Sequence, residues 1–253
     1  MKILFCDDAF PDEEQSLDND KYHLDTTFPK KKNDFENDSV ILRNWMMSHS
    51  EYSSLDTYTQ RNNGSLLISY SDYKKANYIN GWYPCFKNVT FRTEIFSLSD
   101  CINENWKNID TFINQSQWNG FFVKDFAKSL TTSRGSIAKD LKEVNEVIKE
   151  MQFYGIDKGI AIRELHDLNV NTEKRHFCFQ GNIISNSPIE SYILEKVEQF
   201  EHPFFSFDTI QDNNGKQWIV EIGDGQVSSL KNISIEMLYQ NIFNNKNVKG
   251  MKI

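Results

Sequence analysis

Short hydrophobic runs separated by polar segments mark the first part of the chain. The runs that predict buried strands are Lys2–Cys6, Ser39–Met47 and Leu66–Ile68. Between the last two, Leu55–Gln60 predicts a helix that ends at Asn63-Gly64. Strand, helix and strand in this order are typical of a parallel sheet, so we expect residues 1–95 to form a small α/β domain. We interpret the polar and densely charged stretch Asp12–Asp38 as a long loop or an excursion from the sheet.

From residue 119 onward the pattern changes to longer strands, amphipathic helices and hairpins. Apolar residues recur every three or four positions in Ile137–Tyr154, and Ile189–Phe200 is also amphipathic, so both segments predict helices with one buried face. The segments that predict strands or hairpins are Asn119–Leu130, Gly159–Leu165, Glu173–Ser185 and Phe204–Asp224, the last two with turns at 180–182 and 213–215.

Composition and charge restrict the class of protein. Of the 253 residues, 39% are hydrophobic and 25% are charged, which is typical of a soluble globular protein. The net charge of −8 argues against general binding to nucleic acids or anionic membranes. No segment is long enough to span a membrane, and the first apolar run is too short for a signal peptide. We therefore expect a cytoplasmic protein with free thiols, because no CxxC pair or zinc-finger spacing involves its four cysteines, Cys6, Cys85, Cys101 and Cys178.

Two carboxylates stand out in the final predicted hairpin, Phe204–Asp224. Asp208 lies in its first strand and Glu221 near the end of its second, and the turn brings the two acids side by side. Carboxylates that meet repel each other unless a cation neutralises them, and Mg²⁺ with substrate phosphates meets that need. Gly223 next to them leaves room for a ligand near the backbone. The alternative is that both residues are surface acids on an exposed face.

Charged residues also interrupt three other predicted strands. Lys124 and Lys128 are four positions apart, so in a strand both point to the same face and can bind one anion. Alternating positions on two neighbouring strands form a charged face that can line a cleft: Arg163, Glu164, Glu173 and Arg175. Solvated lysines on a half-exposed strand and a ladder of salt bridges explain the same residues equally well when each group is considered alone.

Five short motifs follow one another in a recognisable order. They are LRNW at 42–45, FVKDFAKS at 122–129, IAIREL at 160–165, EKRHF at 173–177 and VEIGDGQVS at 220–228. This order resembles the ATP-grasp superfamily, in particular its R2K clade, over Val40–Leu230 and most closely from Asn119 onward. The resemblance implies an ATP-grasp fold of class α/β (α+β), in which two α+β subdomains clasp a nucleotide. A pre-ATP-grasp-like α/β domain would occupy 1–95, a lid subdomain about 96–162, and a metal-binding subdomain about 163–253.

The resemblance also implies which residues bind ATP. Lys124 and Lys128 would bind the nucleotide phosphates, the backbone of Ala161–Leu165 would hold the adenine, and Glu173 would contact the ribose hydroxyls. Within the adenine-binding segment the implied contact residues are Ile162, Arg163, Glu164 and Leu165.

Further roles follow from the same resemblance. The implied catalytic residues are Lys128, Arg163 and Arg175, the two arginines facing the phosphates or an acyl-phosphate intermediate. Asp208 and Glu221 would be Mg²⁺ ligands, and Arg43 of the LRNW motif would reach the substrate.

One position departs from the family pattern. ATP-grasp enzymes typically carry Glu-x-Asn on the last strand, and here Gly223 stands where the Asn would be. Either Asp224, the next residue, supplies the missing oxygen to the metal, or the site holds fewer ions.

These features favour an ATP-dependent carboxylate–amine ligase that acts through an acyl phosphate with Mg²⁺. Its partners would be ATP and carboxylate and amine substrates, such as an amino acid, a peptide or a protein tail. One alternative is a non-catalytic nucleotide- or peptide-binding module of the same fold, which Gly223 favours. Another is an adenylate-forming enzyme that modifies nucleic-acid ends, which the negative net charge disfavours.

Overall fold

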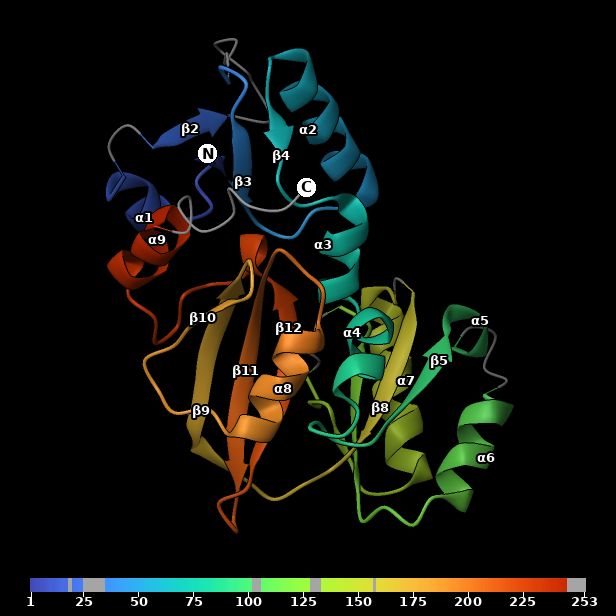
Figure 1. Cartoon of the computed structure of the whole chain (residues 1–253). Coiled ribbons are helices and arrows are strands. Elements are labelled where there is room, and N and C mark those ends of the chain that lie inside the picture. The colour runs from blue at the N-terminus through green and yellow to red at the C-terminus, as the bar shows by residue number, and fades with distance from the viewer. Residues whose placement is uncertain (18–19, 25–34, 102–105, 128–132, 157, 245–253) are drawn as a thin grey trace.

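Three four-stranded sheets organise the part of the chain that the structure describes (Figure 1). The structure, a computed structural model, describes residues 1–17, 20–24, 35–101, 106–127, 133–156 and 158–244. We call the three sheets the N-terminal, middle and C-terminal sheets. This mixed architecture confirms the expected α/β (α+β) class.

The N-terminal sheet is parallel, with strand order β2-β1-β3-β4. Its strands are β1 (Lys2–Cys6), β2 (Lys21–Leu24), β3 (Ser39–Arg43) and β4 (Ser65–Leu66), and its helices are α1 (Pro11–Gln15) and α2 (His49–Arg61). The predicted parallel α/β unit is therefore confirmed. The interpretation of Asp12–Asp38 as a loop was wrong in part, because α1 and the edge strand β2 lie there. Pro11 favours a helix start, and three acids in the first turn of α1 complement the helix dipole.

Two helices precede the middle sheet along the chain. The strands of this sheet lie in the order β5-β8-β6-β7. The elements are α3 (Tyr70–Asn77), α4 (Ile79–Phe86), β5 (Thr93–Ser97), α5 (Leu98–Cys101), α6 (Lys107–Gln115), β6 (Phe121–Asp125), β7 (Ile137–Ala138), α7 (Leu141–Tyr154) and β8 (Gly159–Glu164). Asp140 caps α7 by accepting a hydrogen bond from the backbone of Glu143. Strand β6 ends at Asp125, and Lys128 lies outside the described residues.

The C-terminal sheet is antiparallel, with strand order β10-β9-β11-β12. Its elements are β9 (Leu168–Phe179), β10 (Asn182–Ile184), α8 (Ser191–Gln199), β11 (Phe204–Asp212), β12 (Gln217–Asp224), the 3₁₀ turn η1 (Gly225–Val227) and α9 (Ile235–Asn244). Both predicted hairpins are present. In the register of β11, Asp208 lies opposite Glu221 on one side and opposite Arg175 on the other.

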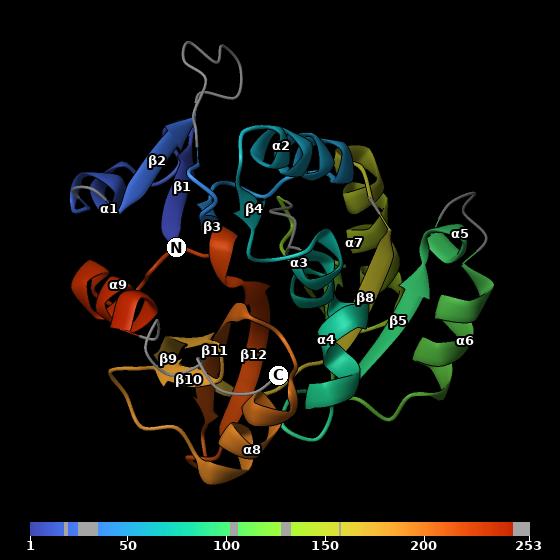
Figure 2. The same ribbon diagram turned by 45° about the horizontal axis from the view of Figure 1, so that its top comes forward.

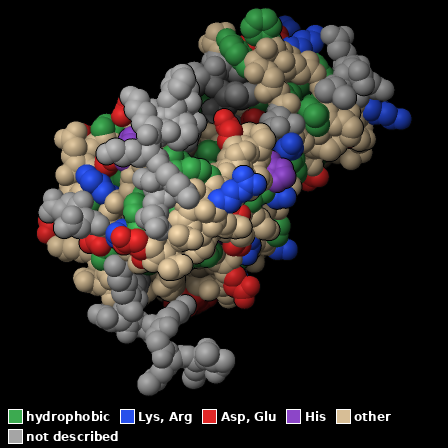
Figure 3. Space-filling model, turned by 90° about the horizontal axis from the view of Figure 1, so that it is seen from above, with side chains coloured by type: hydrophobic (Ala, Val, Ile, Leu, Met, Phe, Trp, Pro, Cys, Tyr) green, Lys and Arg blue, Asp and Glu red, His purple; other side chains and the backbone are tan. Residues whose placement is uncertain are grey.

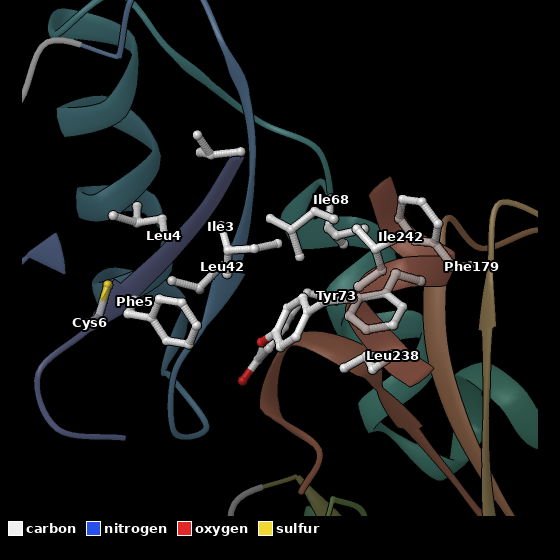
Figure 4. Packing of buried hydrophobic residues seen from close by; sticks show 14 of the residues in the cluster. Ile3, Leu4, Phe5, Cys6, Leu42, Ile68, Tyr73, Phe179, Leu238 and Ile242 are labelled. Atoms are coloured by element: carbon white, nitrogen blue, oxygen red, sulfur yellow. The ribbon is translucent and has the colours of Figure 1, made fainter. Parts of the chain in front are cut away.

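Hydrophobic packing joins the ends of the chain. The buried residues of β1 and β3 pack in one cluster with residues of α3, of the C-terminal sheet and of α9 (Figure 4). Leu238 and Ile242 of α9 are fully buried in it, so the last helix returns to the N-terminal sheet (Figure 2). A second cluster places α4 between the C-terminal and middle sheets through Trp82 and Phe86. The three sheets are thus fixed around a shared interior.

The expected subdomain boundaries stay proposals. The boundary at residue 95 falls within β5, and the boundary at about 162 falls within β8, which belong to the same sheet. Among the described residues, none of the helices has the length and apolarity needed to cross a bilayer. Cys6, Cys85, Cys101 and Cys178 are all free thiols.

His176 of β9 provides a pH-dependent contribution to the stability of this sheet. Its ring is buried, with Nδ1 2.7 Å from Ser185 Oγ and Nε2 2.8 Å from Thr209 Oγ1. Burial lowers the pKa of His176 from 6.5 to about 4. The folded state therefore binds a proton less readily than the unfolded chain, and stability is lost as the pH falls from the unfolded pKa toward the folded one.

We predict that His176→Gln reduces the loss of unfolding free energy between pH 7 and pH 4 by up to ~3 kcal/mol. Urea unfolding at a series of pH values measures this slope for the wild type and the variant. His49→Gln, a change at an exposed histidine, is the control and keeps the wild-type slope. An unchanged slope in His176→Gln would show that the imidazole is not kept neutral by folding.

Candidate functional site

A buried lysine crosses from the middle sheet to the C-terminal sheet. Lys124 of β6 is 3% exposed, and its Nζ lies 3.2 Å from Oε1 of Glu221 on β12. Burial lowers the pKa of Lys124, and the Glu221 carboxylate opposes that shift. The Glu221 side chain itself is 39% exposed, so one of its sides faces open space. Lys124 and Glu221 thus form an ion pair between the middle and C-terminal sheets, next to an open space.

Asp208 of β11, opposite Glu221 in the hairpin, is held by two cations. Arg175 of β9 donates from Nε and Nη2 to its two carboxylate oxygens at 2.7 and 2.8 Å, and Lys231 Nζ lies 2.8 Å from Oδ2. Lys231 also contacts Oε1 of Glu173 at 2.6 Å. Burial acts to raise the pKa of Asp208, but the bonds to Arg175 and Lys231 outweigh it and lower the pKa. Asp208 is therefore ionised at neutral pH.

A cavity of about 390 Å³ opens beside these charges, and we call it the charged cleft. The hairpin contributes Asp208, Glu221 and Gly223, and β9 contributes Arg175. Four further segments line it, through Trp45 and Met46, Asn77, Ala127, and residues 227–229. The hairpin thus supplies carboxylates to a cleft that the rest of the chain encloses.

Arg163 lies between the middle and C-terminal sheets, and its guanidinium group donates hydrogen bonds to other residues of the protein. Its Nη1 donates to the Val220 carbonyl and its Nη2 to Thr90 Oγ1, both at 2.7 Å. Its guanidinium carbon is 5.1 Å from the centroid of Phe91, and no described residue forms a hydrogen bond with its Nε. Burial lowers the pKa of Arg163 to about 10, so the side chain stays charged at neutral pH. In this arrangement Arg163 connects β8 to β12.

The segment expected to hold adenine is the central strand of the middle sheet. Ile162 and Arg163 pair with β5 on one side and β6 on the other, and the Leu165 amide donates to the Gly120 carbonyl. Ile162 packs in the core of the middle sheet, away from the charged cleft. Glu164 is ion-paired to Arg92. Strand pairing within the sheet therefore occupies both edges of β8 at Ile162 and Arg163.

Asp224 and Arg43, two further expected site residues, do not line the charged cleft either. Asp224 is fully buried and faces the opposite side of β12 from Glu221 and Gly223, where its Oδ2 is 3.3 Å from His202 Nε2. It also caps η1 through the amide of Gln226. Side chains an odd number of positions apart in a strand point to opposite faces, so Asp224 does not take the place of the Asn that Gly223 replaces.

Arg43 is the second of these residues. It is fully buried, donates to both carboxylate oxygens of Glu13 at 3.0 and 2.6 Å, and donates to the carbonyls of Gly225 and Ser228. The ring of Phe10 covers it, with the guanidinium carbon 3.9 Å from the centroid. Arg43 thus links the N-terminal sheet to the loop after β12 and presents no surface to a substrate.

The charged cleft fits a hard divalent cation bound together with phosphate. Asp208 and Glu221 supply carboxylate oxygens from facing positions, and Mg²⁺ commonly takes one or two protein carboxylates and completes its shell with water and substrate phosphates. Among the described residues, no group of three or more His, Cys, Asp or Glu side chains is placed to hold a metal. Two carboxylates therefore match a metal that is held jointly with nucleotide.

Lys231 is a site residue that the sequence analysis missed. It follows the last predicted hairpin by a loop and has a positive φ of 51°, a backbone conformation that non-glycine residues seldom adopt. Its role is visible only in the folded chain, where the loop brings Lys231 into contact with Asp208 and Glu173. The sequence feature that could have identified Lys231 is the lysine that ends SSLK, the stretch that continues the VEIGDGQVS motif.

We predict that Lys231→Met binds Mn²⁺ about fivefold more tightly than the wild type in the absence of nucleotide. Removing one of the two cations at Asp208 leaves that carboxylate more available to a metal ion. The concentration of free Mn²⁺, measured by electron paramagnetic resonance, gives the affinity. Lys216→Met removes the same charge at an exposed position of the hairpin and should leave the affinity unchanged. Equal or weaker binding by Lys231→Met would contradict this role.

Comparison with solved structures shows a shared fold over nearly the whole chain. The chain is similar to D-cycloserine synthetase DcsG, with 8% identity, a TM-score of 0.66, and coverage of 97% of this chain and 99% of that one. It is similar to the ATP-grasp ligase PsnB complexed with a phosphomimetic variant of its minimal precursor, Mg and ADP (10%, 0.62, 96% and 96%). It is also similar to macrocyclase MdnC bound with precursor peptide MdnA from Microcystis aeruginosa MRC (12%, 0.59, 97% and 100%).

Comparison by sequence identifies the family. No curated protein matches the chain. The family model of the ATP-grasp domain, R2K clade family 3, matches residues 68–242, which is more than half of the chain. The resemblance inferred from the five motifs is thereby confirmed, and the ATP-grasp fold with it. The chain belongs to the R2K clade of ATP-grasp domain proteins, family 3.

Proposed function

We propose that this protein is an ATP-dependent ligase that joins a carboxylate to an amine and releases ADP and phosphate. The single observation that carries the proposal is the contact of Lys124 with Glu221 across two sheets, beside Asp208 and Arg175. This cluster combines cations for phosphate with carboxylates for a metal in one cleft. Membership of a ligase-containing superfamily supports the same conclusion.

The chemistry explains why such a cleft is needed. A carboxylate is not electrophilic and does not condense with an amine at neutral pH. Transfer of the γ-phosphoryl group of ATP to the carboxylate gives an acyl phosphate, whose phosphate the amine then displaces. Positioning and charge neutralisation carry most of a phosphoryl transfer, so no covalent protein nucleophile is required.

Named residues can perform these tasks. Lys124, which contacts Glu221, and Arg175, whose guanidinium lines the cleft, would hold phosphate oxygens beside the hairpin. Asp208 and Glu221 would hold Mg²⁺, which when bound neutralises the charge that develops on the phosphate oxygens. Glu173, ion-paired with Lys231, remains our candidate for the ribose hydroxyls. We keep Lys128, Ile162, Arg163, Glu164 and Leu165 as proposed nucleotide contacts.

Two of the similar structures direct attention to peptides. PsnB was solved with a phosphomimetic variant of its minimal precursor, and MdnC with precursor peptide MdnA. We therefore include a peptide or protein tail, along with a free amino acid, among the carboxylate and amine substrates of this chain.

The four free cysteines of the chain support the expectation of a reducing, cytoplasmic setting.

The alternatives predict different products. A non-catalytic binding module, favoured by Gly223 on the cleft wall, would bind ATP and form no ADP. An adenylate-forming enzyme acting on nucleic-acid ends would release AMP. It would need a basic groove, whereas Lys and Arg are interspersed with Asp and Glu on the face seen in Figure 3 and the net charge is −8.

We predict that Lys124→Met and Glu221→Gln each lower ADP formation at least ~100-fold, because each removes a charge from the phosphate-binding cluster. ADP release with ATP, Mg²⁺ and a panel of carboxylates and amines measures this effect. Thermal unfolding checks that both variants fold. Lys142→Met, a change at an exposed residue of α7, is the control and keeps full activity. Normal turnover in either folded cluster variant would refute the assignment.

A further inference from the structure

Two serine hydroxyls line the charged cleft beside its carboxylates. Ser206 is 2% exposed and Ser228 is 8% exposed. Ser206 lies two positions before Asp208 on β11. Across the hairpin it pairs with Gly223, which lies two positions after Glu221 on β12. Side chains two positions apart in a strand point to the same face, so this face carries two carboxylates at one pair of residues and a hydroxyl with a glycine at the next.

The two hydroxyls occupy the space that Gly223 leaves beside the strand. A Cβ atom on Gly223 would lie 3.1 Å from Ser228 Oγ and 3.2 Å from Ser206 Oγ, which is closer than ordinary van der Waals contact. The next residue along the strand, Asp224, is buried against His202 on the opposite face. The side-chain oxygen atoms beside Gly223 are therefore those of the two serines.

The hydrogen bonds of this serine pair use both hydroxyl hydrogens. Ser228 Oγ donates to the Asp224 carbonyl at 2.8 Å and lies 2.7 Å from Ser206 Oγ. A hydroxyl carries one hydrogen, so the hydrogen between the two serines comes from Ser206. The reverse arrangement would require Ser206 to donate to the Gly223 carbonyl at 3.5 Å, which is a much longer contact. Ser206 therefore offers its lone pairs, and not a hydrogen, to a ligand in the cleft.

Oxygen lone pairs beside carboxylates favour a metal cation. Asp208 and Glu221 bring carboxylate oxygens to the same face, and Ser206 adds a third oxygen group. Oxygen ligands suit hard divalent ions such as Mg²⁺ and Mn²⁺. The Glu221 side chain is 39% exposed, and Gly223 has no side chain to separate it from Ser206. An ion bound by Glu221 can therefore also contact Ser206 Oγ.

We propose that Ser206 Oγ is a third protein ligand of the divalent cation in the charged cleft, and that Ser228 holds it in place by accepting its hydrogen. The role of this cation in phosphoryl transfer rests on the proposed ligase function, whereas the ligand assignment rests on the geometry of the hairpin. The hydroxyl supplies an oxygen at the point where Gly223 replaces the Asn of the family pattern, since Asp224 faces away.

Metal binding without nucleotide tests this assignment independently of catalysis. Electron paramagnetic resonance of free Mn²⁺ gives the affinity of the wild type, of Ser206→Ala and of Ser191→Ala, a matched control that removes the same hydroxyl at an exposed position of α8. We expect Ser206→Ala to bind Mn²⁺ at least about tenfold more weakly than the wild type, because it lacks one ligand, and Ser191→Ala to keep the wild-type affinity. Thermal unfolding checks that the variants fold.

A change of ligand chemistry separates direct metal contact from a structural role. In Ser206→Cys a soft sulfur replaces the hydroxyl oxygen, and Cd²⁺ prefers sulfur more strongly than Mn²⁺ does. Displacement of bound Mn²⁺ by Cd²⁺ gives the ratio of the two affinities. We expect this ratio to shift toward Cd²⁺ at least about tenfold in Ser206→Cys and to stay unchanged in Ser191→Cys. All of these proteins retain the four native cysteines, so the background binding of Cd²⁺ is the same.

An unchanged Mn²⁺ affinity in folded Ser206→Ala would overturn the proposal. So would weaker Mn²⁺ binding by Ser206→Ala together with an unchanged metal preference in Ser206→Cys, because the hydroxyl would then act through the packing of the hairpin. If Ser206→Ala fails to fold, the metal preference of Ser206→Cys decides. Failure here with ADP formation intact in the wild type would leave the ligase proposal standing, and success without ADP formation would refute only the ligase.

Discussion

The desolvation of cationic side chains between two sheets is the constraint on which this structure depends. Lys124, Arg163 and Arg175 are each more than nine-tenths buried, and burial lowers the pKa of the first two. A buried charge is tolerated only when opposite charges or carbonyls face it. Glu221, Asp208 and the Val220 carbonyl do so, and all three belong to the last hairpin. The hairpin register and the approach of the two sheets therefore determine each other.

Strand alternation made part of this site predictable. The turn at 213–215 and the apolar residues around Asp208 and Glu221 indicate a hairpin, and pairing across it places the two acids opposite each other, as the structure has them. The same alternation shows that Asp224 points away from Glu221. The order of five motifs was sufficient to infer the family and the fold.

Tertiary contacts account for what the sequence could not predict. Arg43 stands beside apolar residues in a strand, and only the approach of Glu13 from α1, within the segment interpreted as a loop, explains why it is buried. Lys231 reaches Asp208 because a loop of positive φ returns to the sheet.

The path of the carboxylate oxygen distinguishes activation of a carboxylate as its acyl phosphate, which we propose, from the alternatives. With an accepted carboxylate labelled with ¹⁸O, ATP, Mg²⁺ and an amine, we expect one ¹⁸O atom in the inorganic phosphate released for each bond formed, measured by the isotope shift in ³¹P nuclear magnetic resonance. Transfer of the ¹⁸O to AMP, or its complete retention in the product and the unreacted acid, would contradict the account.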